Sequence, residues 1–328
     1  MRFGVRYSFR NPKPWRVHPS QLYNRILDQI EWLDGNGFDA VSFAEHHGRD
    51  DDFLPSLMTI CAATAARTKH VRIGTDIFLL PLHHPVQVAE DGAIVDILSN
   101  GRFELVVGAG YIEDEFSAFG MKLNQRPGRM EEGVEIIKRC WTEQEFSFQG
   151  RYYQLDKVRV TPKPVQSPRP KIIMGTSSVA AARRAARIAD GMKPADSSLW
   201  ETYYSELESM GRSVHRRVHL PHPVYLHITE DPERDWPLIA PHGRYEIECY
   251  QKWGMGLSAY GELLNNDAAL RKTYILATPD EAITLLKPLH DANPDDTFWF
   301  APLLPGMNPE LGQASLELAA RKVIPFLK

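Results

Sequence analysis

A glutamate and two histidines in succession, Glu45-His46-His47, directly follow an apolar run that ends at Ala44. Imidazole titrates near neutral pH, so it can donate or accept a proton during a reaction. We expect His46 to be catalytic and His47, which alternates away from it, to be structural. Glu45 would orient His46 or accept backbone donors. The alternative is a histidine that only hydrogen-bonds its loop. Adjacent residues do not easily converge on one ion, so we expect no metal site.

Two glycine-containing turns could hold a ligand, Gly108-Ala109-Gly110-Tyr111 and Gly175-Thr176-Ser177-Ser178. Glycine lets a backbone approach a ligand closely. The hydroxyl residues of the second turn precede a helix pattern, whose first amides and positive dipole end suit a phosphate. The expected cofactor-binding residues in these turns are Gly108, Gly110, Tyr111, Gly175, Thr176, Ser177 and Ser178. Simple capping of the helix by serine or threonine is the alternative.

Short apolar or β-branched runs that alternate with amphipathic helix patterns would position these residues. Strands are predicted at Phe3–Ser8, Phe38–Ala44, Val71–Leu79, Arg102–Val107, Lys171–Met174, Met192–Ala195, His222–Ile228 and Thr297–Ala301. Intervening helices imply parallel strands with right-handed crossovers. About eight such units favour a closed (β/α)8 barrel, a TIM barrel, whose sites gather at the carboxyl ends of the strands. No Gly-x-Gly-x-x-Gly follows the first strand, which weakens the dinucleotide-binding alternative.

Two segments depart from this alternation. Residues 145–168 contain aromatic and turn residues, which indicate a small β excursion and an extended connection. Residues 231–266 are rich in Trp, Tyr, Pro and Gly and indicate an insertion or lid at the carboxyl face of the strands. Its aromatic residues, which either line a substrate or pack internally, are Tyr245, Tyr250, Trp253 and Tyr260.

Composition restricts the classes of partner. The chain has 328 residues, 43% of them hydrophobic, and a formal net charge of -4. The sequence has no excess of basic residues, so nucleic acid is not an expected partner. No apolar run of 18 or more residues is present and the first residues lack an apolar signal region, so we expect a cytoplasmic protein that does not span a membrane. Cys61, Cys140 and Cys249 are far apart and odd in number, which fits neither a disulfide scaffold nor a zinc site.

The motifs at the expected strand ends form an ordered series. Its members are Ala44–Gly48, Ile73–Pro81, Leu98–Phe103, Gly108–Tyr111 and Met174–Ser178. In order and spacing this series resembles the bacterial luciferase-like flavin monooxygenase family, a superfamily that includes F420-dependent oxidoreductases. The resemblance implies one TIM-barrel domain over residues 1–328, with insertions at the carboxyl face of the strands. It also implies FMN, or the deazaflavin F420, bound at that face.

The resemblance also assigns individual residues. His46 matches the histidine that assists oxygen chemistry beside the flavin. The match places a non-proline cis peptide at Asp76–Ile77, with Ile77 behind the isoalloxazine ring. An ordinary strand with an exposed aspartate is the alternative. The family's phosphate-binding arginine has no counterpart, because Ala109 stands at its position. Arg183 or Arg184 would have to compensate.

The implied function is that of a flavin-dependent monooxygenase. Reduced FMN, supplied by a separate flavin reductase, and O2 would oxidise an aldehyde, a ketone or a terpenoid-like substrate. An F420-dependent hydride-transfer oxidoreductase and a non-catalytic flavin-binding barrel are the alternatives. The resemblance suggests a homodimer that packs through the second and third helices, including the Ala-rich face of residues 56–66. In the helix that opens at Pro85, we expect Ile94, Ile97 and Leu98 to face inward.

Overall fold

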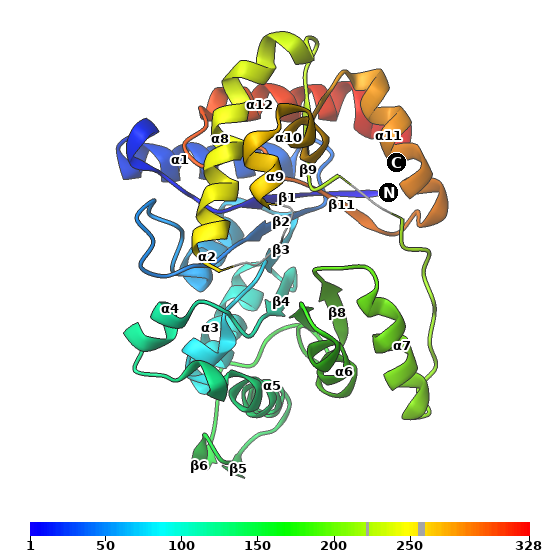
Figure 1. Ribbon diagram of the computed structural model, residues 1–328. Coiled ribbons are helices and arrows are strands. Elements are labelled where there is room, and N and C mark those ends of the chain that lie inside the picture. Colours follow the sequence, from blue (N-terminus) through cyan, green and yellow to red (C-terminus); the bar gives the residue numbers. More distant parts are fainter. Residues whose placement is uncertain (221–222, 255–259) are drawn as a thin grey trace. The chain divides into compact units, whose positions relative to one another are not determined.

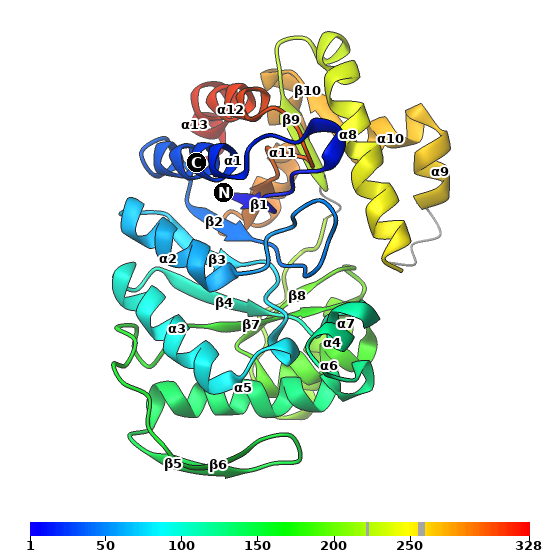
Figure 2. The same ribbon diagram turned by 90° about the vertical axis from the view of Figure 1, so that its left-hand side faces the viewer.

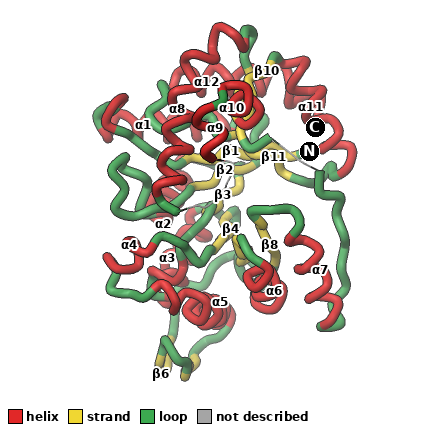
Figure 3. The backbone as a smooth tube through the Cα atoms, in the orientation of Figure 1, coloured by secondary structure: helices red, strands yellow, loops and turns green. Residues whose placement is uncertain are grey.

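The computed structural model describes residues 1–220, 223–254 and 260–328, without the side chains of Tyr260 and Glu262. Strands and helices alternate along most of the chain, which gives an α/β fold (Figures 1 and 3). The chain divides into two compact units, and each is described by itself. Within the described residues, no helix is long and apolar enough to cross a membrane.

The first unit comprises residues 1–42, 46–55 and 218–328. β1 pairs with β11 in parallel, and β9 pairs with β10 in parallel. The strands are β1 (Arg2–Tyr7), β2 (Ala40–Phe43, whose last residue belongs to the second unit), β9 (Tyr225–Ile228), β10 (Tyr274–Ala277) and β11 (Thr297–Phe300). The α-helices are α1 (Pro19–Asp34), α8 (Pro232–Lys252), α9 (Tyr260–Asn265), α10 (Asp267–Thr273), α11 (Pro279–Ala292), α12 (Pro309–Leu318) and α13 (Ile324–Leu327). A 3-10 turn, Lys13–Trp15, and a π-helical turn, Ala319–Val323, complete it.

The long helix α8 is part of the core of this unit, although its residues were expected to form an insertion or lid. The Asp231 side chain caps its first turn by accepting a hydrogen bond from the Arg234 amide. Its apolar face, which includes Trp236 and Ile239, packs in one cluster with Tyr225 of β9 and Tyr274 of β10. This helix was not predicted from the sequence, because Pro237 and Pro241 lie inside it and proline usually interrupts a helix.

The second unit comprises residues 43–45 and 56–217. β3, β4, β7 and β8 pair in that order, all in parallel. The parallel strands are β3 (Arg72–Thr75), β4 (Phe103–Val107), β7 (Ile172–Thr176) and β8 (Gly191–Pro194). The helices are α2 (Leu57–Arg67), α3 (Pro85–Leu98), α4 (Glu113–Ala118), α5 (Arg126–Thr142), α6 (Val179–Ile188) and α7 (Leu199–Ser209), with 3-10 turns at Leu80–Leu82 and Leu123–Gln125. The antiparallel hairpin of β5 (Phe146–Gln149) and β6 (Gln154–Val158) lies beyond α5 (Figure 2).

Most predicted strands are present with shifted ends, and the β excursion is the β5–β6 hairpin. The strand predicted from His222 begins at Tyr225, and His222 itself lies outside the described residues. β10 was missed because its four residues follow α10 without a turn signal. Closure of the strands into a (β/α)8 barrel and a single domain over the whole chain stay predictions.

The inward direction expected for three residues of α3 is wrong for Ile94 and Leu98, whereas Ile97 is half-buried. Ile94 is 44% exposed and Leu98 is 49% exposed, whereas Val88 and Val95 are buried. The helix is apolar on more than one side, so the spacing of its apolar residues does not identify the buried face.

Candidate active site

The segment after β3 carries Ile77, and two glycines make room for its side chain. The Asp76–Ile77 peptide bond is cis. A Cβ atom built on Gly108 or on Gly175 would overlap the Ile77 side chain. Both positions, at the ends of β4 and β7, therefore require glycine. These glycines were expected to let the backbone approach a ligand, but in the structure they make room for the Ile77 side chain. Gly110 has a φ of 72°, a left-handed conformation that favours glycine.

Asp76 is held by backbone and by charge. Its amide donates to the Phe43 carbonyl at 2.6 Å. Its carboxylate is only 4% exposed, and Oδ2 lies 2.7 Å from Nζ of Lys193 on β8. The alternative, an ordinary strand with an exposed aspartate, is therefore wrong for Asp76. Lys193 pairs in register with Gly175. It therefore belongs with Asp76, Ile77, Gly108 and Gly175 to one group of residues at the strand ends, the strand-end group. Sequence reasoning missed Lys193, because the strand around it is short and polar.

Glu45 holds the segment that follows β3 by hydrogen bonds. This buried carboxylate accepts a hydrogen bond from the Leu79 amide at 2.7 Å through Oε2. Its Oε1 lies 2.7 Å from Nε2 of His83, whose ring stacks on Phe78 at 4.2 Å between centroids. Of the two roles expected for Glu45, the structure shows acceptance of a backbone donor. Buried carboxylates need such partners, so Glu45 fixes the course of residues 77–83.

The β7–α6 junction presents hydroxyl groups in different surroundings. Thr176 is 4% exposed, and its Oγ1 has no hydrogen-bond partner among the residues that the structure describes. Ser177 is exposed. Ser178 caps α6 by accepting from the Ala181 amide at 3.3 Å, which is the capping role considered as the alternative. A buried hydroxyl without a partner costs free energy, so Thr176 fits a ligand that supplies one.

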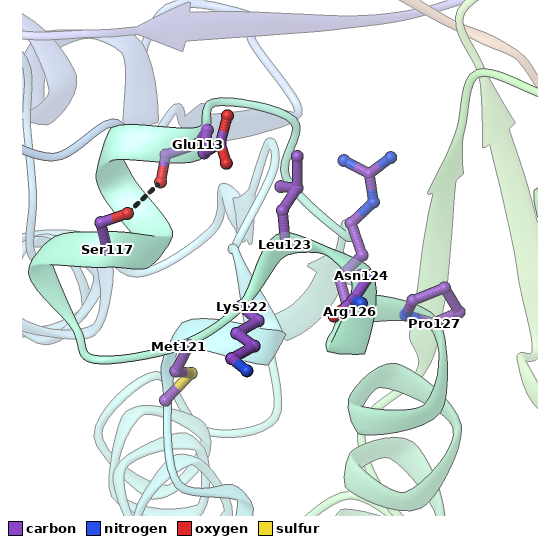
Figure 4. A pocket seen from close by; sticks show the side chains of 8 residues that line it. All are labelled: Glu113, Ser117, Met121, Lys122, Leu123, Asn124, Arg126 and Pro127. Carbon is purple, nitrogen blue, oxygen red and sulfur yellow. Dashed lines mark hydrogen bonds between the residues drawn. The ribbon is translucent and has the colours of Figure 1, made fainter.

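Arg126 is the arginine that the second unit brings to the Gly108–Tyr111 turn. Its Nη1 donates to the Gly110 carbonyl at 2.9 Å. It also lines a hollow of about 600 Å³ between α4, the following turn and the start of α5 (Figure 4). Arg183 and Arg184, the expected substitutes for the missing arginine, instead lie near Glu206 and Glu131 respectively, with Arg184 Nε 2.6 Å from its partner. Arg126 was missed because it opens a helix 16 residues after the turn.

His46 belongs to the first unit and lies among aromatic rings. It is 8% exposed, and its amide donates to the Leu54 carbonyl at 3.3 Å. Its ring centroid lies 4.8 Å from that of Phe53 and 5.2 Å from that of Trp253. Tyr250 is 6.4 Å away. Two of the aromatic residues noted in the sequence, Tyr250 and Trp253, therefore contact His46, whereas the side chain of Tyr260 lies outside the described residues.

The predicted residues thus form groups within each unit. In the second unit the structure brings together Asp76, Ile77, Gly108 and Gly175, with Thr176 at the end of the same strand as Gly175. His46 lies in the first unit with Phe53 and Trp253. Tyr111 is half-buried on the turn after β4.

Comparison with known proteins identifies the family. The family model described as luciferase-like monooxygenase matches residues 1–295. The oxygenase component of a flavin-dependent trigonelline monooxygenase from Acinetobacter baylyi is 31% identical over 46% of this chain and 42% of its own length. An F420-dependent glucose-6-phosphate dehydrogenase from Amycolatopsis mediterranei is 26% identical over 78% of this chain and 82% of its own. Several curated relatives are matched over only about half of their length.

Solved structures agree with this assignment. The monooxygenase RslO1 from Streptomyces bottropensis superposes with a TM-score of 0.79 at 25% identity, over 99% of both chains. The family match covers most of the chain, and the structural match covers nearly all of it. The chain therefore belongs to the luciferase-like monooxygenase family of enzymes.

Proposed function

We propose that the protein is a flavin-dependent monooxygenase that uses reduced FMN and O2 to oxidise a small organic substrate. The observation that carries the proposal is the strand-end group of the second unit. There, the Ile77 side chain lies against two glycines that leave no room for a Cβ atom, and the buried Thr176 hydroxyl has no hydrogen-bond partner among the described residues. A flat ring system that packs on Ile77 and a phosphate that reaches Thr176 would satisfy both features.

The residues that would hold FMN lie at the strand ends of the second unit and at the start of α5. Thr176 and Ser177, with the first amides of α6, would bind the phosphate. Arg126, anchored on the Gly110 carbonyl, would supply the positive charge that Ala109 cannot. Ser178 would contact the phosphate through its backbone amide, because its hydroxyl already caps the helix. Asp76, Gly108, Gly110, Tyr111 and Gly175 would complete the cofactor contacts.

Reduced FMN, when bound, supplies the two electrons with which O2 is activated. His46 would hold or release a proton at an imidazole nitrogen during this reaction, and this assigns it as the catalytic residue. Phe53 and Trp253 pack against its ring. Lys193 would hold the Asp76 carboxylate in place by its ion pair.

Hydride transfer with F420 is the second candidate function. It is favoured by the F420-dependent relative that aligns with 78% of this chain, and by the alanine at position 109. A flavin reductase that delivers reduced FMN belongs to the first candidate only. A non-catalytic flavin-binding barrel would retain the cofactor residues but need no proton-transferring His46.

Oxygen labelling tests the proposed reaction. The protein is incubated with reduced FMN, 18O2 and a panel of aldehydes and ketones, and products are analysed by mass spectrometry. Incorporation of one 18O atom into a product supports the monooxygenase. Conversion only with F420, without label, would support the hydride-transfer alternative instead. FMN binding without any conversion would point to the non-catalytic barrel.

A further inference from the structure

The hollow beside Arg126 is larger than the phosphate site that the proposed function needs. It measures about 600 Å³ and lies within the second unit, between α4, the turn at Leu123–Gln125 and the start of α5 (Figure 4). Sites for whole small molecules measure about 300–1,000 Å³. A phosphate group alone would leave most of this hollow unfilled, so there is room for the body of a ligand.

Two cations line the hollow, and neither is paired with a carboxylate. Arg126 donates through Nη1 to the Gly110 carbonyl at 2.9 Å. Neither Arg126 nor Lys122 forms an ion pair with any residue that the structure describes. By contrast, Arg169 and Arg184 of the same unit each lie 2.6 Å from a carboxylate oxygen. Two unpaired positive charges in one hollow favour an anionic ligand.

The other walls of the hollow suit a ring and a sugar. Met121 and Leu123 are half-buried and pack against a small apolar core that contains Phe116. Glu113 lines the hollow from the first turn of α4, and its carboxylate has no hydrogen-bond partner in the described parts of the chain. A carboxylate accepts hydrogen bonds from sugar hydroxyls, as in the recognition of ribose.

Arg126 joins the hollow to the proposed phosphate site. β4 and β7 are neighbours, with Val107 opposite Met174, so the Gly108–Tyr111 turn and Thr176 follow adjacent strands at the same edge of the sheet. Arg126 is hydrogen-bonded to that turn and also lines the hollow. A ligand that continues past the flavin phosphate would therefore enter the hollow beside Arg126.

We propose that the hollow binds the adenosine monophosphate half of FAD, so that the enzyme binds reduced FAD more tightly than reduced FMN. This inference rests on the proposed function, because it extends the cofactor site of that enzyme. Arg126 and Lys122 bind the second phosphate. The adenine ring packs on Met121 and Leu123, and the ribose hydroxyls donate to Glu113. FAD and FMN carry the same isoalloxazine ring, so the reaction at the strand ends is unchanged.

Four ligands that differ stepwise test the proposal: riboflavin, FMN, FAD and AMP. Their affinities for the cofactor-free protein are measured by isothermal titration calorimetry, with oxidised flavins in air and reduced flavins under nitrogen. FAD is expected to bind at least tenfold more tightly than FMN, since hydrogen bonds between a phosphate and cationic side chains have that effect. AMP should compete with FAD but not with FMN.

Variants of the hollow separate it from the flavin site. Lys122→Met should reduce FAD affinity at least tenfold and leave FMN affinity unchanged, because Lys122 is outside the proposed FMN contacts. Glu113→Ala should also weaken FAD binding, although it removes a negative charge, because the ribose loses its acceptor. The matched control is Lys171→Met, since Lys171 is an exposed lysine of the same unit that precedes β7, at the opposite end of that strand from Thr176. It should leave both affinities unchanged, and thermal melts check that each variant is folded.

Equal affinity for FAD and FMN overturns this inference without contradicting the proposed function. So does an FAD preference that survives in Lys122→Met, and tighter binding of both flavins to Glu113→Ala would show only a general attraction of anions. Tighter binding of NADH or coenzyme A than of FAD would show a site for a separate adenine nucleotide, which also contradicts the proposal. FAD and FMN that bind as expected but yield no 18O-labelled product would count against the proposed function alone.

Discussion

Among single residues, His46 is the one on which the proposed reaction depends most. General acid or base assistance typically accelerates a step by about 10²–10⁴-fold. His46→Ala should therefore reduce turnover by at least about a hundredfold, with cofactor affinity nearly unchanged because the proposed tail contacts come from other residues. Turnover and FMN binding are measured on the same sample, with a thermal melt to exclude unfolding. Parental turnover in a folded variant would make His46 structural.

A second residue-scale prediction concerns the acid sensitivity of folding. Burial lowers the pKa of His227 on β9 to about 4. The unfolded chain, in which histidine has an ordinary pKa of about 6.5, therefore binds more protons than the native state as pH falls from 6.5 towards 4. Stability is full above pH 6.5 and is lost below it, by roughly 2 kcal/mol at pH 5. Denaturant unfolding at pH 7 and pH 5 should show a smaller loss in His227→Gln. An equal loss would place the titrating groups elsewhere.

At the scale of the element, much of the fold could be predicted from alternation of strands and helices, but the exact supports of the site could not. The hydroxyl turn before α6 and the glycines after β4 are visible in the sequence. Other contacts join residues that are 30 or more positions apart in the sequence. Gly108 and Gly175 accommodate Ile77, and Glu45 accepts a hydrogen bond from the Leu79 amide.

The β7–α6 junction gives the element-scale prediction. The double variant Thr176→Ala/Ser177→Ala should weaken FMN binding by about ten- to a hundredfold for each residue, because hydrogen bonds to a charged group contribute about 1.5–3 kcal/mol. Riboflavin, which lacks the phosphate, should be affected much less. Arg126→Met should show the same selective loss, and Arg184→Met, whose guanidinium pairs with Glu131, is the matched control. Unchanged FMN affinity in the double variant would exclude this turn as the phosphate site.

At the scale of the whole molecule, we predict a homodimer. The exposed Ile94 and Leu98 give α3 an apolar surface that a second copy could cover. Light scattering at micromolar concentration should therefore give twice the mass of one chain, and Ile94→Glu/Leu98→Glu should give a folded monomer. Leu285→Glu on α11, another exposed apolar residue, is the control. A parent protein that stays monomeric would contradict the prediction.

The most direct test of the account is an anaerobic titration of the protein with reduced FMN and with reduced F420, repeated with both oxidised cofactors. We expect reduced FMN to bind at least tenfold more tightly than reduced F420. We also expect that admitting O2 to the FMN complex, together with a neutral ketone, starts oxygen consumption that His46→Ala reduces. Selective binding of F420, with no oxygen consumption in the presence of FMN, would contradict the proposed monooxygenase.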